Sequence, residues 1–503
     1  MRQFSRREFL GVCGASGGLL TAPGLIRADS SSNAKLAGQK PNIILILTDD
    51  QGYGELGCHG NPIIRTPNLD RFHAESLRFT DFHVSPTCSP TRCSIMTGRH
   101  EFRSGVTHTI LERERMSLKA TTIAQVLKSA GYTTGIFGKW HLGDEAPFQP
   151  GQRGFDEVFI HGAGGIGQTY PGSCGDAPGN RCFDPAILHN RVFEKTQGYC
   201  TDLFFGQALK WIGEKREGNA PFFAYITPNA PHSPLQCPEN YVKLYEGAGL
   251  DKSGMAYYGM ITNIDDNVGQ LLAKLQEWSL DGNTLIIFMT DNGHSRANLF
   301  NAGMRSAKGS TYQGGTRVPS FWRWTGHLPA GVDVGHLTAH IDLFPTFAAL
   351  AGARIPDGLQ LDGRSLVPLL EDPNAPWPDR FVFIHKGRWA RGKAAQSKYA
   401  TCAVRNERFS LVNNKELYDI RNDPGETRNV LGQCPEVVAQ MRAAYDKWWD
   451  EVLPCMENET AVGPKMNPFK ELYWKQFGGG PASAPQENPE RKKERKTKKK
   501  EQR

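Results

Sequence analysis

Two polar pairs in the 503-residue sequence have the composition of a hard-cation site. Asp49-Asp50 follows one apolar run, and Asp291-Asn292 follows another much later in the chain. Three carboxylates and one amide oxygen suit Ca²⁺, with Mg²⁺ as the alternative, because zinc sites usually contain His or Cys ligands. A single Asp pair at a strand end often only caps a helix or closes a turn. Two such pairs at two strand ends favour a cation site.

The segment Cys88-Ser89-Pro90-Thr91-Arg92 combines a thiol with a nearby proline. Pro90 suits the first turn of a helix, so Cys88 is expected at the helix N-terminus, where free N–H groups favour anions. The same position is expected to lower the pKa of the thiol. From these residues alone, Cys88 is either a thiolate nucleophile or a buried structural cysteine.

Two histidines and a lysine lie at or after the ends of other apolar runs. Lys139 lies at the end of one run and His141 just past it, and His232 lies between two prolines after another run. A single histidine is more often a surface or hydrogen-bonded core residue than a catalytic one. Here the positions just past strand ends favour general acid/base chemistry, which histidine performs most often.

The elements that must position these residues alternate between strands and helices, which predicts an α/β fold with a mixed, mostly parallel, doubly wound sheet. In such sheets ligands bind beyond the carboxyl ends of the strands, so the polar residues above are expected to share one site. Apolar runs predict buried strands at residues 42–48, 133–140, 221–227 and 284–290. Capping residues and helical spacing predict helices from Pro67, over 121–130 and over 261–275.

The pattern changes after about residue 375. Short strands are expected at 381–383, 399–405 and 409–412, with Asn413-Asn414 as a turn and a helix beginning at Pro435. The sequence therefore predicts a catalytic domain at 41–375 and a smaller C-terminal α+β subdomain at 376–475.

Both ends of the chain are basic. Of the formal net charge of +7, residues 1–28 contribute +3 and residues 481–503 contribute +5, so the remainder is nearly neutral at −1. This distribution argues against a nucleic-acid-binding domain. Residues 1–28 contain Arg6-Arg7 before Phe9-Leu10 and a mild apolar stretch, typical of a twin-arginine signal, which predicts export to the periplasm or beyond. Residues 478–503 are expected to form a disordered basic tail, and no apolar run is long enough for a transmembrane span.

Eleven cysteines are present. An exported protein permits disulfides. Cys174 and Cys182 flank a short Gly/Pro-containing loop and are the first candidates for a pair, although sequence alone does not determine connectivity.

The Cys88–Arg92 stretch closely resembles type I sulfatases, in which the Cys of Cys-x-Pro-x-Arg is oxidised to formylglycine (3-oxoalanine). The resemblance extends from about residue 41 to 449. It implies an alkaline-phosphatase-like fold and an arylsulfatase-like sulfuric ester hydrolase acting on carbohydrates or aryl alcohols. Further similar segments, in the family's order, lie at 49–54, 66–70, 138–143, 230–234, 290–293 and 308–312.

The resemblance also implies a mechanism. A formylglycine hydrate at position 88 has two hydroxyls, of which one attacks sulfur and the other expels sulfate. A formylglycine-generating or radical maturase is then a necessary partner. Asp291 would help to deprotonate the attacking hydroxyl, His232 would protonate the leaving oxygen, and His141 would assist sulfate release.

The same resemblance implies which groups bind the ligands. The residues expected around the cation are Asp49, Asp50, Cys88, Asp291 and Asn292. Together with the cation, Arg92, Lys139 and Lys308 would hold the sulfate oxygens. Thr91 stands where the family usually has Ser or Ala. Gln313 stands where many members have Glu, which removes a charge near Lys308.

Two other segments bear on the ligand. Gly162-x-Gly164-x-x-Gly167 matches a dinucleotide-binding pattern, but Pro171 and Gly172 leave no room for the helix that would hold a pyrophosphate. We expect a Gly-rich loop at the pocket rim instead. Lys386, Arg388, Arg391, Lys393 and Lys398 form a basic stretch that is either a solvated loop or a site for extra sulfates, with Trp389 stacked on a sugar.

Two other functions stay open at this stage. A phosphodiester or phosphonate hydrolase could use the same scaffold, since tetrahedral anions are alike in size and charge. A non-catalytic binder of sulfated glycans would result if Cys88 were never converted.

Overall fold

Five parallel strands form the middle of a mixed sheet in the computed structural model, which describes residues 35–296 and 298–481. β1 (Asn42–Thr48) pairs with β8 (Phe222–Thr227) on one side and β9 (Thr284–Thr290) on the other. β8 also pairs with β4 (Thr133–Lys139), and β4 pairs with β5 (Glu157–His161). All residues of β1, β8 and β9 are buried, which explains their mainly apolar sequences.

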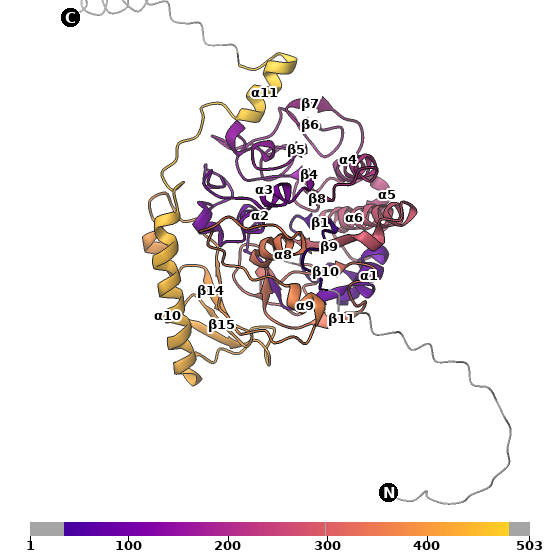
Figure 1. The fold of residues 1–503 in the computed structure, drawn as a ribbon. Helices are drawn as coiled ribbons and strands as arrows, with labels where there is room; N and C mark the ends of the chain where they lie inside the picture. Colours follow the sequence, from indigo (N-terminus) through magenta and orange to yellow (C-terminus); the bar gives the residue numbers. More distant parts are fainter. Residues whose placement is uncertain (1–34, 297, 482–503) are drawn as a thin grey trace, which may run out of the picture. The chain divides into compact units, whose positions relative to one another are not determined.

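Shorter strands extend this sheet at both edges, mostly in antiparallel pairing, to ten strands in the described part of the chain (Figure 1). The mixed, mostly parallel α/β class predicted from the sequence is therefore confirmed. The edge strands are β10 (Ser320–Arg323), β2 (Leu77–Phe79) and β11 (Val332–Val334) beyond β9, and β6 (Ala186–His189) and β7 (Val192–Lys195) beyond β5. A separate pair consists of β3 (Phe82–His83) and β12 (Thr338–Ala339).

Helices cover both faces of the sheet, as a doubly wound fold requires. Ile43 and Leu45 of β1 pack into one core with α2, α3 and α8, whereas Ile44 and Ile46 pack into a second core with α1, α4 and α6. Figure 1 shows these two groups of helices on opposite sides of β1. Their bounds are α1 (Pro67–Ala74), α2 (Cys88–Thr97), α3 (Ile123–Ser129), α4 (Cys200–Lys215), α6 (Lys252–Glu277) and α8 (Leu343–Leu350). Shorter helices are α5 (Glu239–Lys243), α7 (Gln313–Thr316) and α9 (Val367–Glu371).

The helix boundaries follow local capping chemistry. α3 begins at Ile123 because Thr122 and Gln125 form a capping box, and the chain turns away at Gly131, whose φ is 94°. Thr66 precedes α1 as predicted, but it does not cap the helix. Its hydroxyl instead accepts a hydrogen bond from the Gly57 amide and donates one to Asp70.

A four-stranded antiparallel sheet and a long helix lie in the C-terminal part (Figure 1). Asn413 and Asn414 turn the chain between two of its strands with φ values of 51° and 56°, as predicted for a tight turn. Val438, Met441 and Trp448 on the helix are buried against the sheet. The bounds are β13 (Val382–His385), β14 (Cys402–Arg405), β15 (Phe409–Val412), β16 (Glu416–Asp419) and α10 (Pro435–Val452).

The last helix, α11 (Pro468–Phe477), returns to the edge of the large sheet. Gln476 accepts a hydrogen bond from the Phe193 amide of β7 and donates one to the Phe193 carbonyl, at 2.8 and 2.7 Å. None of the helices in the described ranges is both long and apolar enough to cross a membrane.

The predicted pairing of Cys174 with Cys182 is wrong. Both are free thiols, and the two sulfurs face different backbone carbonyls, those of Thr109 and Pro234. The predicted signal at 1–28 lies outside the described residues, and so does all but the first few residues of the predicted tail.

Candidate active site

The carboxyl ends of the parallel strands bring together the side chains singled out in the sequence. Asp49 and Asp50 follow β1, and Asp291 and Asn292 follow β9. The Asp50 amide donates to Asp291 Oδ1 at 3.1 Å, and the Asn292 amide nitrogen donates to Asp50 Oδ1 at 2.9 Å, so the two acidic segments touch. Lys139 ends β4, and His232 lies in the loop after β8.

Several oxygen atoms in this cluster have no hydrogen-bond donor. Asp49 Oδ1 and Asn292 Oδ1 are buried and unpartnered among the described residues. Buried polar atoms are normally satisfied, so these two oxygens fit the requirement of a bound ion. Ligand atoms of Asp49, Asp50, Cys88 and His232 lie within 4.8 Å of one another. Two of these four atoms are carboxylate oxygens, and the adjoining Asp291 and Asn292 add further oxygens, which are the ligands that a hard cation prefers.

Three basic side chains neutralise the carboxylates. Lys139 Nζ lies 2.6 Å from Asp49 Oδ2, and Lys308 Nζ lies 2.5 Å from Asp50 Oδ1. Arg92 donates to Asp291 Oδ2 at 2.8 Å. Asp50 is thus the acidic partner of Lys308. Gln313, which stands where many relatives are expected to have Glu, donates its backbone amide to Glu426 at 2.7 Å.

The aspartates differ in their electrostatic surroundings. Burial alone would raise the pKa of Asp50, but Lys308, His232 and Lys139 outweigh it and hold the pKa below its usual range. Burial and the neighbouring charge of Asp49 raise the pKa of Asp291 to about 6, despite Arg92. Asp291 is therefore the more basic of the two carboxylates.

Cys88 is the first residue of α2, as predicted from Pro90, and its side chain is buried. Its sulfur lies 4.0 Å from Asp50 Oδ1. The expectation of a lowered thiol pKa is wrong. Burial raises the pKa of Cys88 to about 11, and Lys139 and Lys308 offset it only in part. An unmodified Cys88 would therefore remain a thiol, which makes it a poor thiolate nucleophile.

Arg92 lies one turn after Cys88 on α2 and is fully buried. Besides Asp291, its guanidinium contacts the Lys139 carbonyl at 3.1 Å and the hydroxyl of Thr227. These contacts tie α2 to the ends of β4, β8 and β9. Burial opposes the charge of Arg92, but Asp291 and Asp49 outweigh it and raise the pKa, so the guanidinium stays charged.

Both histidines use one ring nitrogen to contact a backbone carbonyl. His141 Nε2 lies 2.8 Å from the Thr109 carbonyl, and His232 Nδ1 lies 2.7 Å from the Ser233 carbonyl. A carbonyl only accepts hydrogen bonds, so each of these nitrogens carries the proton. Burial lowers the pKa of both rings, that of His232 to about 4, so both are neutral and keep a free lone pair on the other nitrogen.

The Gly-rich loop after β5 lies against these histidines. A Cβ on Gly164 would lie 2.6 Å from His141 Cε1, and a Cβ on Gly165 would lie 2.8 Å from His232 Nδ1. Real Cβ atoms do not approach so closely, so a larger residue at either position would displace the neighbouring histidine ring. No helix follows the loop, which agrees with the rejection of a dinucleotide site.

The basic stretch after β13 divides into two groups. Lys386 and Arg388 lie near the site: the Arg388 amide donates to the Thr107 carbonyl, and Arg388 also donates to the Thr109 hydroxyl. Lys398 instead pairs with Asp446 of α10. Of the two alternatives for this stretch, sugar stacking by Trp389 is contradicted, because the residue is only 8% exposed and packs into the C-terminal core.

Sequence reasoning missed three groups that hold the site together. Thr227 contacts Arg92, the Thr109 carbonyl orients His141, and Tyr257 of α6 donates to the Asp50 carbonyl at 2.6 Å. Thr227 ends a predicted strand, so its position was a usable signal. The other two contacts depend on how distant segments meet, which no local pattern reveals.

Comparison with known proteins adds independent information. The Sulfatase family model matches residues 41–353, and the model described as N-sulphoglucosamine sulphohydrolase, C-terminal, matches residues 307–448. Arylsulfatase A of Homo sapiens is 33% identical over 454 residues, 80% of this chain and 86% of the relative. N-acetylgalactosamine-6-sulfatase of Mus musculus is 33% identical over 393 residues, 73% of this chain and 72% of the relative. The crystal structure of Ps i-CgsB in complex with k-i-k-neocarrahexaose has a TM-score of 0.75 at 29% identity and covers 89% of this chain and 98% of its own.

Proposed function

The chain belongs to the sulfatase family and is a sulfatase, and we propose that it hydrolyses sulfate esters of carbohydrates through formylglycine at position 88 and a bound Ca²⁺. The observation that carries this proposal is the position of Cys88. It begins a buried helix within 4.8 Å of ligand atoms of Asp49, Asp50 and His232. A plain thiol there has a raised pKa, so the position favours a modified side chain over a thiolate.

The residues present fit a hard divalent cation. Asp49, Asp50, Asp291, Asn292 and the modified side chain of residue 88 would hold it, and the unpartnered oxygens of Asp49 and Asn292 are the atoms it would satisfy. Arg92, Lys139 and Lys308 already balance the three carboxylates. A bound cation would therefore give the site a net positive charge. That charge would attract the sulfate group into the site and polarise it.

The modified residue 88 supplies the hydroxyl that attacks sulfur and a second hydroxyl whose deprotonation releases sulfate. Asp291 accepts the proton of the attacking group, and its raised pKa suits that role. Lys139, Lys308 and Arg92 hold the sulfate oxygens and stabilise the charge that develops on them.

The two histidines divide the remaining proton transfers. His232 keeps Nδ1 on the Ser233 carbonyl, so Nε2 is the atom that would protonate the leaving oxygen. A bound sulfate ester brings negative charge beside this ring, which raises its pKa and favours the protonated form. His141 keeps its proton on Nε2, so its unpartnered Nδ1 is a base for the sulfate-releasing step.

Carbohydrate sulfates are the substrate class that the surroundings favour. Lys386 and Arg388 lie beside the site and add positive charge. Burial lowers the pKa of His108 to about 3, and Arg388, Arg113 and Lys386 lower it further. Such a rim suits a substrate with a second sulfate or carboxylate group. N-acetylgalactosamine-6-sulfatase and the Ps i-CgsB complex with k-i-k-neocarrahexaose are carbohydrate-related relatives, which agrees with this choice.

The remaining parts of the proposal concern export, maturation and domain organisation. We infer that residues 1–28 direct export to the periplasm or beyond, and that a formylglycine-generating or radical maturase converts Cys88 before export. We also keep the division into a catalytic domain at 41–375 and a C-terminal subdomain at 376–475 as a proposal.

Mass spectrometry of the peptide that contains residue 88 tests the proposal directly. The full chain is purified from a host able to convert the cysteine, and sulfate release from sulfated sugars is measured on the same sample. We expect formylglycine at position 88 and loss of activity in Cys88→Ser. Full activity with an intact Cys88 thiol would refute the mechanism.

A matched pair of substrates tests the reaction class. We expect faster hydrolysis of sulfate monoesters than of phosphate diesters or phosphonates that carry the same alcohol. The opposite preference would favour a phosphodiester or phosphonate hydrolase. Tight binding of sulfated sugars without turnover, together with an unconverted Cys88, would favour a glycan-binding protein.

A further inference from the structure

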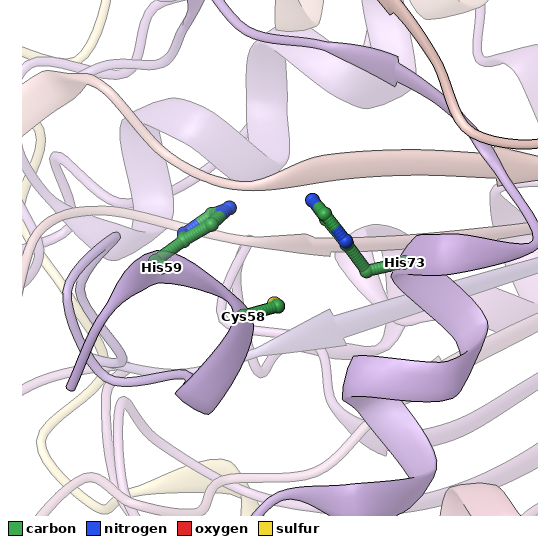
Figure 2. A group of neighbouring side chains, drawn as sticks. All are labelled: Cys58, His59 and His73. Atoms are coloured by element: carbon green, nitrogen blue, oxygen red, sulfur yellow. The ribbon is translucent and has the colours of Figure 1, made fainter. Parts of the chain in front are cut away.

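A second group of metal-ligating side chains lies away from the strand ends. Cys58 and His59 belong to the short 3₁₀ helix η1 (Gly57–His59), and His73 lies in the last turn of α1. Their side chains converge from these two elements in Figure 2. One ligand atom of each lies within 4.8 Å of the others. We call these three residues the Cys/His/His cluster.

The ring of His59 is already oriented as in a metal ligand. His59 Nδ1 lies 2.7 Å from the Tyr53 carbonyl, so Nδ1 carries the proton and Nε2 keeps a free lone pair. Metal-bound histidines commonly donate their other N–H to a carbonyl in this way. Tyr53 also stacks on the ring with centroids 3.8 Å apart, which further fixes its orientation.

His73 is free to supply the second nitrogen. No hydrogen bond to its ring occurs within residues 35–296 and 298–481, and the ring is partly exposed. Its ring centroid lies 5.7 Å from that of His59, with the planes nearly perpendicular. The ring also packs edge-on against Phe321 with centroids 4.9 Å apart, so its rotation toward Cys58 and His59 would change aromatic packing but break no hydrogen bond of the described residues.

Cys58 supplies a soft ligand beside an acidic group. Its backbone amide donates to Asp70 Oδ1 at 2.8 Å, and its side chain is half-buried. One thiolate and two imidazoles form a set that favours Zn²⁺ and similar borderline-soft cations over Ca²⁺. Tetrahedral zinc needs ligand atoms about 3.3–3.7 Å apart. The ligand atoms must therefore move closer by about 1.5 Å at most, which side-chain rotation can supply.

A cavity gives the cluster access to solvent. Its volume is about 350 Å³, and Cys58, His59 and His73 form part of its wall. Arg78 and Asp333 lie on the same wall and pair with each other at 2.6 Å, so neither presents an unbalanced charge. A water molecule from this cavity would fill a fourth position on the metal.

We propose that Cys58, His59 Nε2 and a ring nitrogen of His73 bind Zn²⁺, with a water molecule as the fourth ligand. Burial and Asp70 raise the pKa of the Cys58 thiol, so it keeps its proton in the absence of a metal. On binding, the sulfur of Cys58 forms the bond to zinc and its proton is released to solvent. The ion would tie η1 to α1, in the segment that directly follows Asp49 and Asp50. This site is separate from the proposed calcium site in both its residues and its ligand chemistry.

The test uses the full chain loaded with Ca²⁺, so that the oxygen-rich site is occupied. Zn²⁺ is then titrated and the apparent Tm is followed, with an expected rise of about 2–4 °C at a hundredfold excess over Kd. Co²⁺ in place of Zn²⁺ is expected to give a thiolate-to-cobalt charge-transfer absorption at one equivalent. Neither readout depends on catalysis, so failure here is distinguishable from failure of the proposed sulfatase mechanism.

Variants assign the signals to these residues. We expect Cys58→Ser to abolish the cobalt absorption and His73→Gln to weaken zinc affinity at least tenfold. Cys88→Ser keeps the absorption, and His327→Gln, at an exposed histidine stacked on Trp324, keeps the affinity. An absorption unchanged in Cys58→Ser, or no zinc-dependent Tm rise in the wild type, would overturn the proposal. His59 and His73 would then only pack against Phe321, with Cys58 beside the same core.

Discussion

Substitution of Gly165 by Ala should displace the ring of His232, the proposed general acid, while leaving that residue itself unchanged. The new Cβ would lie 2.8 Å from His232 Nδ1 and 3.0 Å from His232 Cε1. Comfortable contacts between such atoms begin near 3.5 Å, so the ring must move by about 0.7 Å. That movement disturbs the hydrogen bond from Nδ1 to the Ser233 carbonyl, which orients Nε2.

The size of the effect follows from the displacement. Misplacement of a catalytic group by about 1 Å can reduce the rate about 10²-fold, so we expect Gly165→Ala to lower kcat about 10–100-fold for a sugar sulfate. This loss corresponds to about 1.4–2.7 kcal/mol of transition-state stabilisation. A sugar alkoxide is a poor leaving group, so its departure depends strongly on protonation.

The assay compares two esters in each variant. A nitrophenyl sulfate has a leaving group that needs little protonation, so Gly165→Ala should reduce its hydrolysis much less than that of the sugar sulfate. Gly164→Ala presses on His141 instead, at 2.6 Å from Cε1, and should slow the release of sulfate, which is common to both esters. Gly206→Ala is the control, because its Cβ meets nothing within 4 Å on the exposed side of α4.

Equal losses on the two esters in Gly165→Ala would refute the assignment of His232 as the acid for the leaving oxygen. Undiminished activity on both would refute the claim that the Gly-rich loop fixes this ring.

Three further predictions address the cation, the buried charges and the pH dependence of stability. Removal of Ca²⁺ by a chelator should abolish turnover and weaken the binding of inorganic sulfate at least tenfold, because the charges of the carboxylates and the basic residues then cancel. Calorimetry measures the sulfate affinity, and an unchanged affinity would contradict this prediction. Arg92→Ala should lower kcat about 10²–10³-fold and reduce the free energy of unfolding by about 3–5 kcal/mol, because Asp291 loses its buried partner. Denaturant unfolding measures this free energy, and an unchanged value would argue against the pairing of Arg92 with Asp291. Burial raises the pKa of Glu101 from 4.5 to about 7, so below pH 4.5 both states hold the proton, and between pH 4.5 and 7 only the folded state keeps it. The free energy of unfolding should therefore fall by about 3 kcal/mol as the pH rises through this window. Thermal unfolding of Glu101→Gln should not show this fall. A variant with the wild-type pH profile would show that Glu101 does not titrate in this way.

The sequence determined the central elements and most of the candidate site. β1 and β9 have the predicted bounds because their apolar runs are buried on both faces and end in residues that must reach water or ions. The sequence also predicted that Asp49 and Asp291 lie at the same edge, because the carboxyl ends of parallel strands share that edge. That β1 and β9 are direct neighbours is a result of the fold. Pro90 likewise predicted that Cys88 begins a helix.

Only the tertiary structure decided how these groups behave. Burial raises the pKa of Cys88, whereas the local pattern predicted a lower value, because desolvation depends on every segment packed around the thiol. Trp389 lies in the C-terminal core because its packing partners come from distant parts of the chain. Cys174 and Cys182 remain unpaired for the same reason, since distant segments determine where each thiol lies. The convergence of His73 with Cys58 and His59 likewise depends on how α1 packs beside η1. Local periodicity determines which residues end an element, but the through-space distances that set pKa, pairing and metal affinity arise only when the elements pack together.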